Sequence, residues 1–327
     1  MNKGCPNRCV FCNVQKVAGK QRISLTESAI RETVLSYIRH ARREPDEVQV
    51  AFYGGSFTGL DRNDEIELLG YVKGLMDEGL VHSLRVSTRP DYIDEEQCDL
   101  LRSFGVKTVE LGAQSMVDKV LELSGRGHSA ADTERALKIL KIRDFATGIH
   151  LMVGLPGDNR DKFTYTINRC VDLKPDTVRI HPTIVFENTA LARACREGRY
   201  KPLSMTEAVD ACKYALKRFS SANIPVIRLG LQTTSEMEAA GSIVAGPFHP
   251  AFHALVEESI FYDRACDLLS QRNVAGKTVT LAVSSRDISY MHGQKNGNIK
   301  KLTDRFQLNK IHVIPNAELQ RGAMILI

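Results

Sequence analysis

The chain has 327 residues, 43% of them hydrophobic and 25% charged, which is typical of a globular protein and excludes disordered, collagen-like and coiled-coil chains. No apolar run of about 18 residues predicts a membrane-spanning helix, and no apolar stretch near Met1 predicts a secretory signal. The net charge of +5 is uneven: residues 1–43 carry +7, residues 264–327 carry +6, and the middle carries −8. The basic ends indicate either an anionic partner or ordinary solvated surface.

Helices and strands alternate along the first 230 residues. The first predicted helix opens at a capping box beginning with Ser24 and runs to about Arg43. Because parallel strands need long crossover connections, this alternation predicts an α/β fold with a parallel sheet, closed as a full or partial barrel. Strands are predicted at 48–53, 84–88, 107–111, 148–153, 177–181 and 224–231, and the later helices at 63–78, 94–103, 115–123, 130–143, 159–172 and 204–220.

The sequence changes character at about residue 241. A helix is predicted at 251–270, and strands at 278–284 and 310–314 flank a basic segment, 295–305. We therefore expect two domains, a barrel core over 1–240 and a small basic α+β domain over 241–327.

Three of the eight cysteines, Cys5, Cys9 and Cys12, form a C-x3-C-x2-C motif. Three thiolates on one loop can hold three corners of an iron–sulfur cube and leave the fourth iron open. Zinc is the alternative, but a structural zinc site takes four protein ligands, and no fourth Cys or His lies within 25 residues. The other five cysteines are predicted to be small buried hydrophobic residues.

The cysteine loop, with Phe11 before its last cysteine, resembles the radical S-adenosylmethionine (SAM) superfamily, whose fold is a partial parallel barrel. Several further segments occur in the order seen in the branch of the elongator catalytic subunit, with oxygen-independent coproporphyrinogen oxidases more distant. These segments are 54–58, 112–115, 125–128 and 152–157, together with 246–252, which resembles the C-terminal extension of that branch.

The resemblance implies two cofactors. Cys5, Cys9 and Cys12 would ligate a four-iron four-sulfur cluster, and the amino and carboxylate groups of SAM would chelate its open iron. The residues implied in SAM binding lie mostly at the ends of predicted strands: Phe11 and the segment Gly154–Pro156 at the adenine, Gly54 and Gly55 at the methionine amino group, Gln114 and Arg126 at the ribose and carboxylate, and Ser87 in the same cofactor site.

The chain also departs from these relatives. Ser87 and His150 stand where porphyrinogen oxidases usually carry carboxylates, which weakens that assignment. Only four residues precede Cys5, where relatives have a strand, so we expect either a shorter barrel or a start upstream of Met1. From the length we expect no acetyltransferase domain of the kind that follows in elongator subunits.

The function that the resemblance implies is reductive cleavage of SAM to a 5′-deoxyadenosyl radical, for modification of tRNA or another RNA. The alternatives are a porphyrinogen-oxidase-like enzyme acting on an anionic small molecule and a non-catalytic, cluster-bearing RNA-binding scaffold. We expect an oxygen-sensitive cytoplasmic enzyme with a flavodoxin or ferredoxin as its low-potential electron donor.

The basic residues suggest where RNA would bind. Few aromatic residues accompany them, so we expect electrostatic, salt-dependent binding to the phosphate backbone. The candidates are Lys295, Lys300, Lys301, Arg305 and Lys310 near the C-terminus and Arg39, Arg42 and Arg43 near the N-terminus.

Overall fold

The computed structural model describes residues 5, 8–13, 25–41 and 46–327. The chain divides into two compact units, one made of residues 1–205 and 215–248 and the other of residues 206–214 and 249–327. The predicted division at residue 240 stays a prediction. In the described part of the chain, no helix has both the length and the apolar character needed to cross a membrane.

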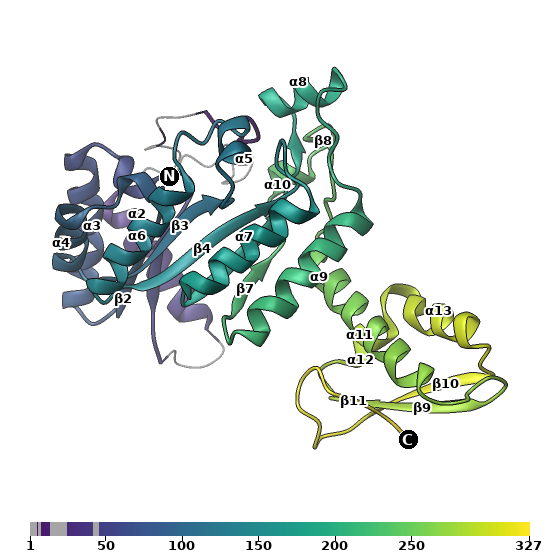
Figure 1. Cartoon of the computed structure of the whole chain (residues 1–327). Helices are drawn as coiled ribbons and strands as arrows, with labels where there is room; N and C mark the ends of the chain where they lie inside the picture. Colours follow the sequence, from purple (N-terminus) through teal and green to yellow (C-terminus); the bar gives the residue numbers. More distant parts are fainter. Residues whose placement is uncertain (1–4, 6–7, 14–24, 42–45) are drawn as a thin grey trace. The chain divides into compact units, whose positions relative to one another are not determined.

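The first unit is built on a six-stranded sheet, in which every neighbouring pair of strands is parallel. Its spatial order follows the chain, and Figure 1 shows the strands as neighbouring arrows. This curled sheet confirms the predicted partial parallel barrel. The strands in spatial order are β1 (Gln49–Phe52), β2 (Ser83–Thr88), β3 (Val106–Gln114), β4 (Ala146–Val153), β5 (Thr177–Pro182) and β7 (Val226–Leu229).

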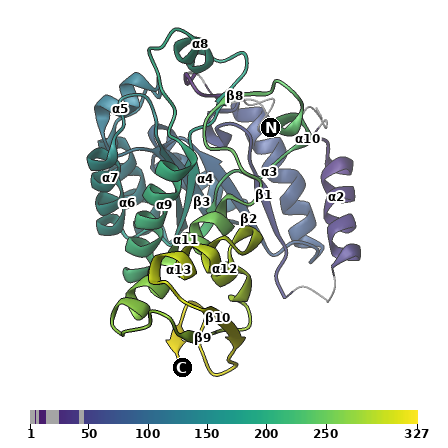
Figure 2. The ribbon, with the colours of Figure 1, turned by 90° about the vertical axis from the view of Figure 1, so that its right-hand side faces the viewer.

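The outer face of this sheet is apolar. Val86, Leu111, Ile149 and Ile180 each have 0% exposure, as expected where crossover helices cover a parallel sheet. Figures 1 and 2 show α6 and α7 running beside each other along the sheet. The helices of this unit are α2 (Glu27–His40), α3 (Arg62–Asp77), α4 (Glu95–Ser103), α5 (Asp118–Leu123), α6 (Ala130–Ile142), α7 (Arg160–Leu173), α8 (Ala190–Arg196) and α10 (Ser235–Glu238), while α9 (Met205–Ser221) contributes residues to both units.

Helix α2 differs from its prediction at both ends. Its N-cap is Thr26, whose hydroxyl accepts the backbone N–H of Ala29, and it ends at His40 rather than Arg43. Ser24 lies outside the described residues. Two short strands, β6 (Val185–Phe186) and β8 (Ile243–Ala245), pair antiparallel and were not predicted.

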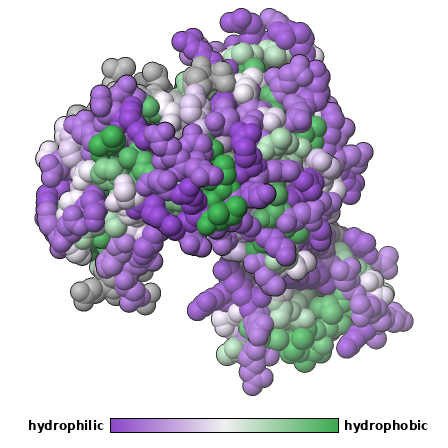
Figure 3. All heavy atoms as spheres, turned by 60° about the vertical axis from the view of Figure 1, so that its left-hand side comes forward, coloured by the Kyte–Doolittle hydropathy of each residue, from purple (hydrophilic) through white to green (hydrophobic). Residues whose placement is uncertain are grey.

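The second unit is a three-stranded sheet of order β10-β9-β11 with three helices. The predicted basic segment 295–305 is mostly α13, whose Leu302 is buried in the core of this unit beside Leu281 and Met291. The space-filling view in Figure 3 shows a hydrophobic area on this unit, and its exposed large apolar residues are Ile314, Ile325 and Ile327. The elements are α11 (Phe252–Ser270), β9 (Thr278–Val283), α12 (Ile288–His292), α13 (Gly297–Phe306), β10 (Lys310–Pro315) and β11 (Met324–Leu326).

Candidate active site

The cysteine loop is fixed by backbone hydrogen bonds on both sides. Val10 donates its N–H to the carbonyl of Ser124 (3.0 Å), and its own carbonyl accepts the N–H of Leu191 (2.8 Å). Cys12 donates its N–H to the carbonyl of Cys9 (3.0 Å), which closes a turn. The unpredicted helix α8, which begins beside Leu191, is therefore one of the two supports of the predicted cluster-binding loop.

Phe11 lies on this support. With Val10 it packs against the small cluster of Val185, Leu191 and Ala192. The ring is half-buried, and its predicted place against the adenine of SAM stays a prediction.

Arg126 joins the cysteine loop to the end of β3. Its Nη1 donates to Sγ of Cys9 (3.2 Å), and its Nη2 donates to the carbonyl of Gly112 (2.6 Å). Arg89 fixes the backbone of Arg126 by donating Nη1 to its carbonyl (2.6 Å), and Arg89 is itself held by two hydrogen bonds to Asp91. The sequence did not single out Arg89, although it follows directly on the predicted strand end.

Gly112 brings Gln114 and Arg126 together. A Cβ at residue 112 would lie 3.2 Å from Nε2 of Gln114 and 3.3 Å from Nη2 of Arg126. Gln114 has φ = 67° at an irregular point in the β3–β4 pairing, a left-handed conformation that is uncommon for any residue but glycine. Backbone outliers of this kind cluster at functional sites. Gln114 and Arg126, both predicted to bind SAM, thus form one polar corner around Gly112.

The Gly54–Gly55 turn lies beside a buried group of hydroxyls. Both glycines have positive φ (92° and 152°), which side chains disfavour. The next residue, Ser56, shares a hydrogen bond with Thr88 (2.8 Å), which also contacts Thr58 (2.6 Å). These hydroxyls fix the turn against the end of β2.

Cys5 lies next to the same turn. Burial raises the pKa of its thiol and Cys9 adds to this shift, while Arg126 and a hydrogen bond from the Ser56 backbone act against it. The structure thus brings Cys5, Cys9, Arg126 and the glycine turn into one neighbourhood.

The segment after β4 is held by two hydrogen bonds to the backbone of one residue, Gly154. Gly154 donates its N–H to Asp158 (3.0 Å), and its carbonyl accepts the hydroxyl of Tyr200 (2.6 Å). Its φ is 79°, and a Cβ would lie 2.9 Å from the side chain of Leu203, so both conformation and space call for glycine. Burial raises the pKa of Asp158 to about 6 against the hydrogen bonds that it accepts. Pro156 is half-buried in the following turn.

The inner face of the sheet is polar. Its residues are Tyr53, Arg85, Ser87, Glu110, His150, Arg179, His181 and Arg228. Glu110, with 0% exposure, accepts hydrogen bonds from Arg85 and from Nε2 of His150 (2.6 Å), and Nε of Arg179 lies 3.2 Å from its carboxylate. Burial alone would raise the pKa of Glu110, but the hydrogen bond and charge of His150 and the two guanidinium groups lower it to about 2. Glu110 is therefore a buried carboxylate anion.

Of this network, only Ser87 was among the predicted site residues, and His150 was noted only as a departure from porphyrinogen oxidases. A signal was present, because strands buried on both faces of a parallel sheet read as continuous apolar runs. Here, instead, polar residues alternate with apolar ones in β2 and β5.

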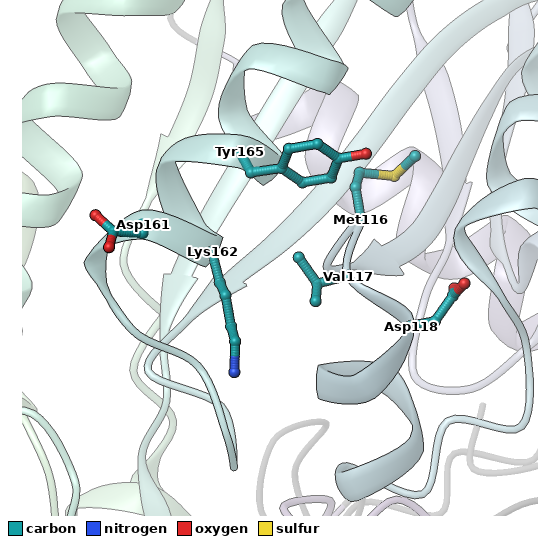
Figure 4. A pocket seen from close by; sticks show the side chains of 6 residues that line it. All are labelled: Met116, Val117, Asp118, Asp161, Lys162 and Tyr165. Atoms are coloured by element: carbon teal, nitrogen blue, oxygen red, sulfur yellow. The ribbon is translucent and has the colours of Figure 1, made fainter.

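An open pocket also lies outside this region, lined by Met116, Val117, Asp118, Asp161, Lys162 and Tyr165 (Figure 4). None of the predicted site residues lines it, and it opens beside the N-terminus of α7 rather than on the inner face.

Comparison with known proteins decides the family. The model of the radical SAM superfamily matches residues 1–170, just over half of the chain. The chain belongs to the radical SAM superfamily, a family of enzymes. The radical SAM C-terminal domain matches residues 175–261 of this radical SAM protein.

Relatives of this radical SAM protein confirm the elongator-like resemblance. It is 37% identical over 136 residues to a tRNA uridine(34) acetyltransferase of Methanocaldococcus jannaschii, covering 41% of this chain and 25% of that protein. It is 29% identical over 217 residues to protein YhcC of Escherichia coli, covering 62% of this chain and 67% of that protein. The chain spans only a quarter to a half of the tRNA uridine(34) acetyltransferases that it matches.

A solved structure supports the same branch. An N-terminally truncated Elp3 of Methanocaldococcus infernus superposes with a TM-score of 0.60 at 25% identity, covering 73% of this chain and 58% of that one. The fold of this radical SAM protein is thus shared with an elongator-type protein.

The family implies a four-iron four-sulfur cluster and SAM, and the residues present fit such groups. Two of the three thiols, Cys5 and Cys9, are neighbours, and Arg126 and Arg89 supply positive charge for an anionic cluster. In the residues described, no three Cys, His, Asp or Glu side chains lie close enough together to hold a metal ion. The complete ligand set Cys5, Cys9 and Cys12 stays a prediction.

Proposed function

We propose that this chain is a radical SAM enzyme that modifies tRNA or another RNA. The observation that carries the proposal is the contact of Arg126 with both Cys9 and Gly112, because it joins the cysteine loop to the strand end that bears Gln114. When bound, the cluster supplies the electron that cleaves SAM reductively to a 5′-deoxyadenosyl radical.

In this proposal the chain's own residues bind and orient the two cofactors. Cys5, Cys9 and Cys12 hold the cluster, and SAM lies along the strand ends. The polar corner of Gln114 and Arg126 suits the ribose and the carboxylate, since a guanidinium binds a carboxylate through two hydrogen bonds. The remaining SAM contacts are proposed for Phe11, Gly54, Gly55, Ser87, Gly154 and Pro156.

Anaerobic reconstitution with iron and sulfide tests the enzymatic part. We expect about four irons per chain and formation of 5′-deoxyadenosine from SAM with dithionite. Cys9→Ala should abolish this product, whereas Cys266→Ala, a buried cysteine of the second unit, should retain it. Wild-type protein that binds RNA but never forms 5′-deoxyadenosine would instead be a cluster-bearing scaffold.

Two observations support RNA as the substrate class. Two relatives of the chain are named tRNA uridine(34) acetyltransferase. In addition, the basic residues of the second unit are exposed, and Lys301 and Arg305 lie over the rings of Tyr262 and Phe306. The charges suit electrostatic binding to a phosphate backbone. The exposed residues are Lys295, Lys300, Lys301, Arg305 and Lys310; Arg39 is exposed on α2, and Arg42 and Arg43 lie outside the described residues.

Binding of unfractionated tRNA at two salt concentrations tests this part. The double variant Lys300→Glu with Lys301→Glu should weaken binding about tenfold and flatten the salt dependence. A charge-matched control, Lys107→Glu with Lys138→Glu, alters two exposed lysines of the first unit and should bind like wild type. Equal weakening by both double variants would show that net charge, and not α13, governs the affinity.

We propose a flavodoxin or ferredoxin as the low-potential electron donor and the cytoplasm as the compartment. Thiolate-held clusters need a reducing, oxygen-poor environment, so the enzyme should be oxygen-sensitive.

A further inference from the structure

The inner face of the sheet carries more positive than negative charge. Glu110 is the carboxylate that contacts its guanidinium groups, and it is already shared between Arg85 and Arg179. Arg228 is different, because no carboxylate of the described residues lies within ion-pair distance of it. One guanidinium on this face is therefore left for an anion from outside the chain.

Arg228 lies beside Arg179. Arg228 on β7 pairs with Arg179 on β5, directly after a register irregularity between Val178 and Arg179. Both guanidinium groups act on His181: burial, together with the charges of His150, Arg179 and Arg228, lowers the pKa of this histidine to about 3. His181 stays neutral and donates Nδ1–H to the carbonyl of Gly230 (3.1 Å), so it does not serve as the counter-charge.

Three rings form a row next to these arginines. Tyr53 and His150 are nearly parallel, with centroids 6.5 Å apart, and His150 meets His181 edge-on at 6.0 Å. Arg179 links the two features, since it lies 5.2 Å from the ring centroid of Tyr53 and donates Nη2–H to its hydroxyl (2.8 Å). Flat rings beside guanidinium groups are what proteins use to bind a base together with its phosphate.

We propose that Arg228 and Arg179 bind the phosphate of the nucleotide that the enzyme modifies. The base of that nucleotide lies against Tyr53 and His150, at the inner face of the sheet. This inference rests on the proposed function and names the part of the RNA that enters the barrel. The row of rings favours a single nucleotide over a carboxylate-bearing small molecule, because a carboxylate needs only the arginines.

Isothermal titration calorimetry tests the proposal. The reconstituted holoenzyme, with SAM bound, is titrated either with uridine 5′-monophosphate or with uridine. Arg228→Gln should weaken binding of the monophosphate about tenfold, the typical loss of one charge-assisted hydrogen-bonded contact. Binding of uridine should not change. Because Arg228 has no carboxylate partner among the described residues, the melting temperature should stay close to that of wild type. The control is Arg160→Gln, an exposed arginine of α7.

Unchanged binding of the monophosphate in Arg228→Gln, or an equal loss in Arg160→Gln, would overturn the inference. So would a loss of coproporphyrin binding in Arg228→Gln without a loss of nucleotide binding. If Arg228→Gln melts early, Arg228→Lys replaces it and should recover part of the monophosphate affinity. Failure of the proposed function would give a different result. In that case the wild-type holoenzyme would form no 5′-deoxyadenosine, whether or not Arg228→Gln changes nucleotide binding.

Discussion

Glu110 and Leu111 are neighbours in β3, and both have 0% exposure, yet they stabilise the sheet in different ways. Leu111 points to the outer face, where apolar side chains pack under the helices. Glu110 points to the inner face, where hydrogen bonds and ion pairs from β2, β4 and β5 surround it. The outer face depends on close packing, which changes little with pH. The inner face depends on charge, so protons and anions can alter it.

The largest effect should come from the outer face. Leu111→Ala should lower the free energy of unfolding by about 4 kcal/mol, because it removes packed methyl groups and leaves a cavity. Urea denaturation at pH 7 and at pH 5 should give the same loss. If the loss of unfolding free energy in Leu111→Ala depends strongly on pH, the outer face is not stabilised independently of the charged inner face.

On the inner face, Glu110→Gln should cost about 3 kcal/mol at pH 7, because it leaves Arg85 and Arg179 without their buried counter-charge. The folded-state pKa of Glu110, about 2, is below its ordinary value of 4.5. Its contribution is therefore complete above pH 4.5 and disappears as the pH falls towards 2.

The test is the difference in unfolding free energy between wild type and Glu110→Gln, measured across this pH range. It should shrink steadily with acidification. A constant difference would contradict the assignment of Glu110 as an ionised group.

A smaller loss is expected where glycine makes room for the charged network. In Gly148→Ala, the new Cβ would lie 2.7 Å from Cγ of Glu110, so the carboxylate must move, at a cost of about 2 kcal/mol. Gly70→Ala in α3 is the matched control, with no atom within 4 Å of the new Cβ, and should be neutral or stabilising by about 0.5 kcal/mol. Thermal melts of both variants compare the two sites directly.

The smallest effect should be on ligand affinity rather than stability. Gly112→Ala places a Cβ against Gln114 and Arg126, so SAM should bind the reconstituted protein roughly threefold to tenfold more weakly. Equilibrium dialysis measures this change. Unaltered SAM affinity would place the carboxylate and ribose contacts elsewhere.

The sheet was predictable because its signals are local. Each strand of the barrel is a short segment rich in apolar residues, either continuous or alternating with polar ones, and each crossover helix has its own periodicity. Helix α13 was missed because its segment reads as a basic stretch; only its place in the tertiary structure shows that Leu302 belongs to a core. The strands β6 and β8 were missed because two or three residues carry no periodic signal.

The site was predictable only where a motif fixed it. Cys9, Gly112, Gln114 and Arg126 come from segments with a recognisable order, and the structure brings these four residues together. The pairing of Glu110 with Arg179 joins residues 69 positions apart, and it depends on strand register. A single sequence does not specify strand register, so contacts of this kind become visible only in the structure.

The backbone hydrogen bonds of Val10 also bear on when the cysteine loop can dock during protein synthesis. Its partners, Ser124 and Leu191, are 114 and 181 residues further along the chain. The ribosome exposes the N-terminus first, so Cys9 and Cys12 emerge long before the loop that carries them can dock. Contacts of such large sequence separation form late in folding. Cluster insertion in this protein should therefore follow assembly of the half-barrel, and truncated chains ending before Leu191 should retain little iron.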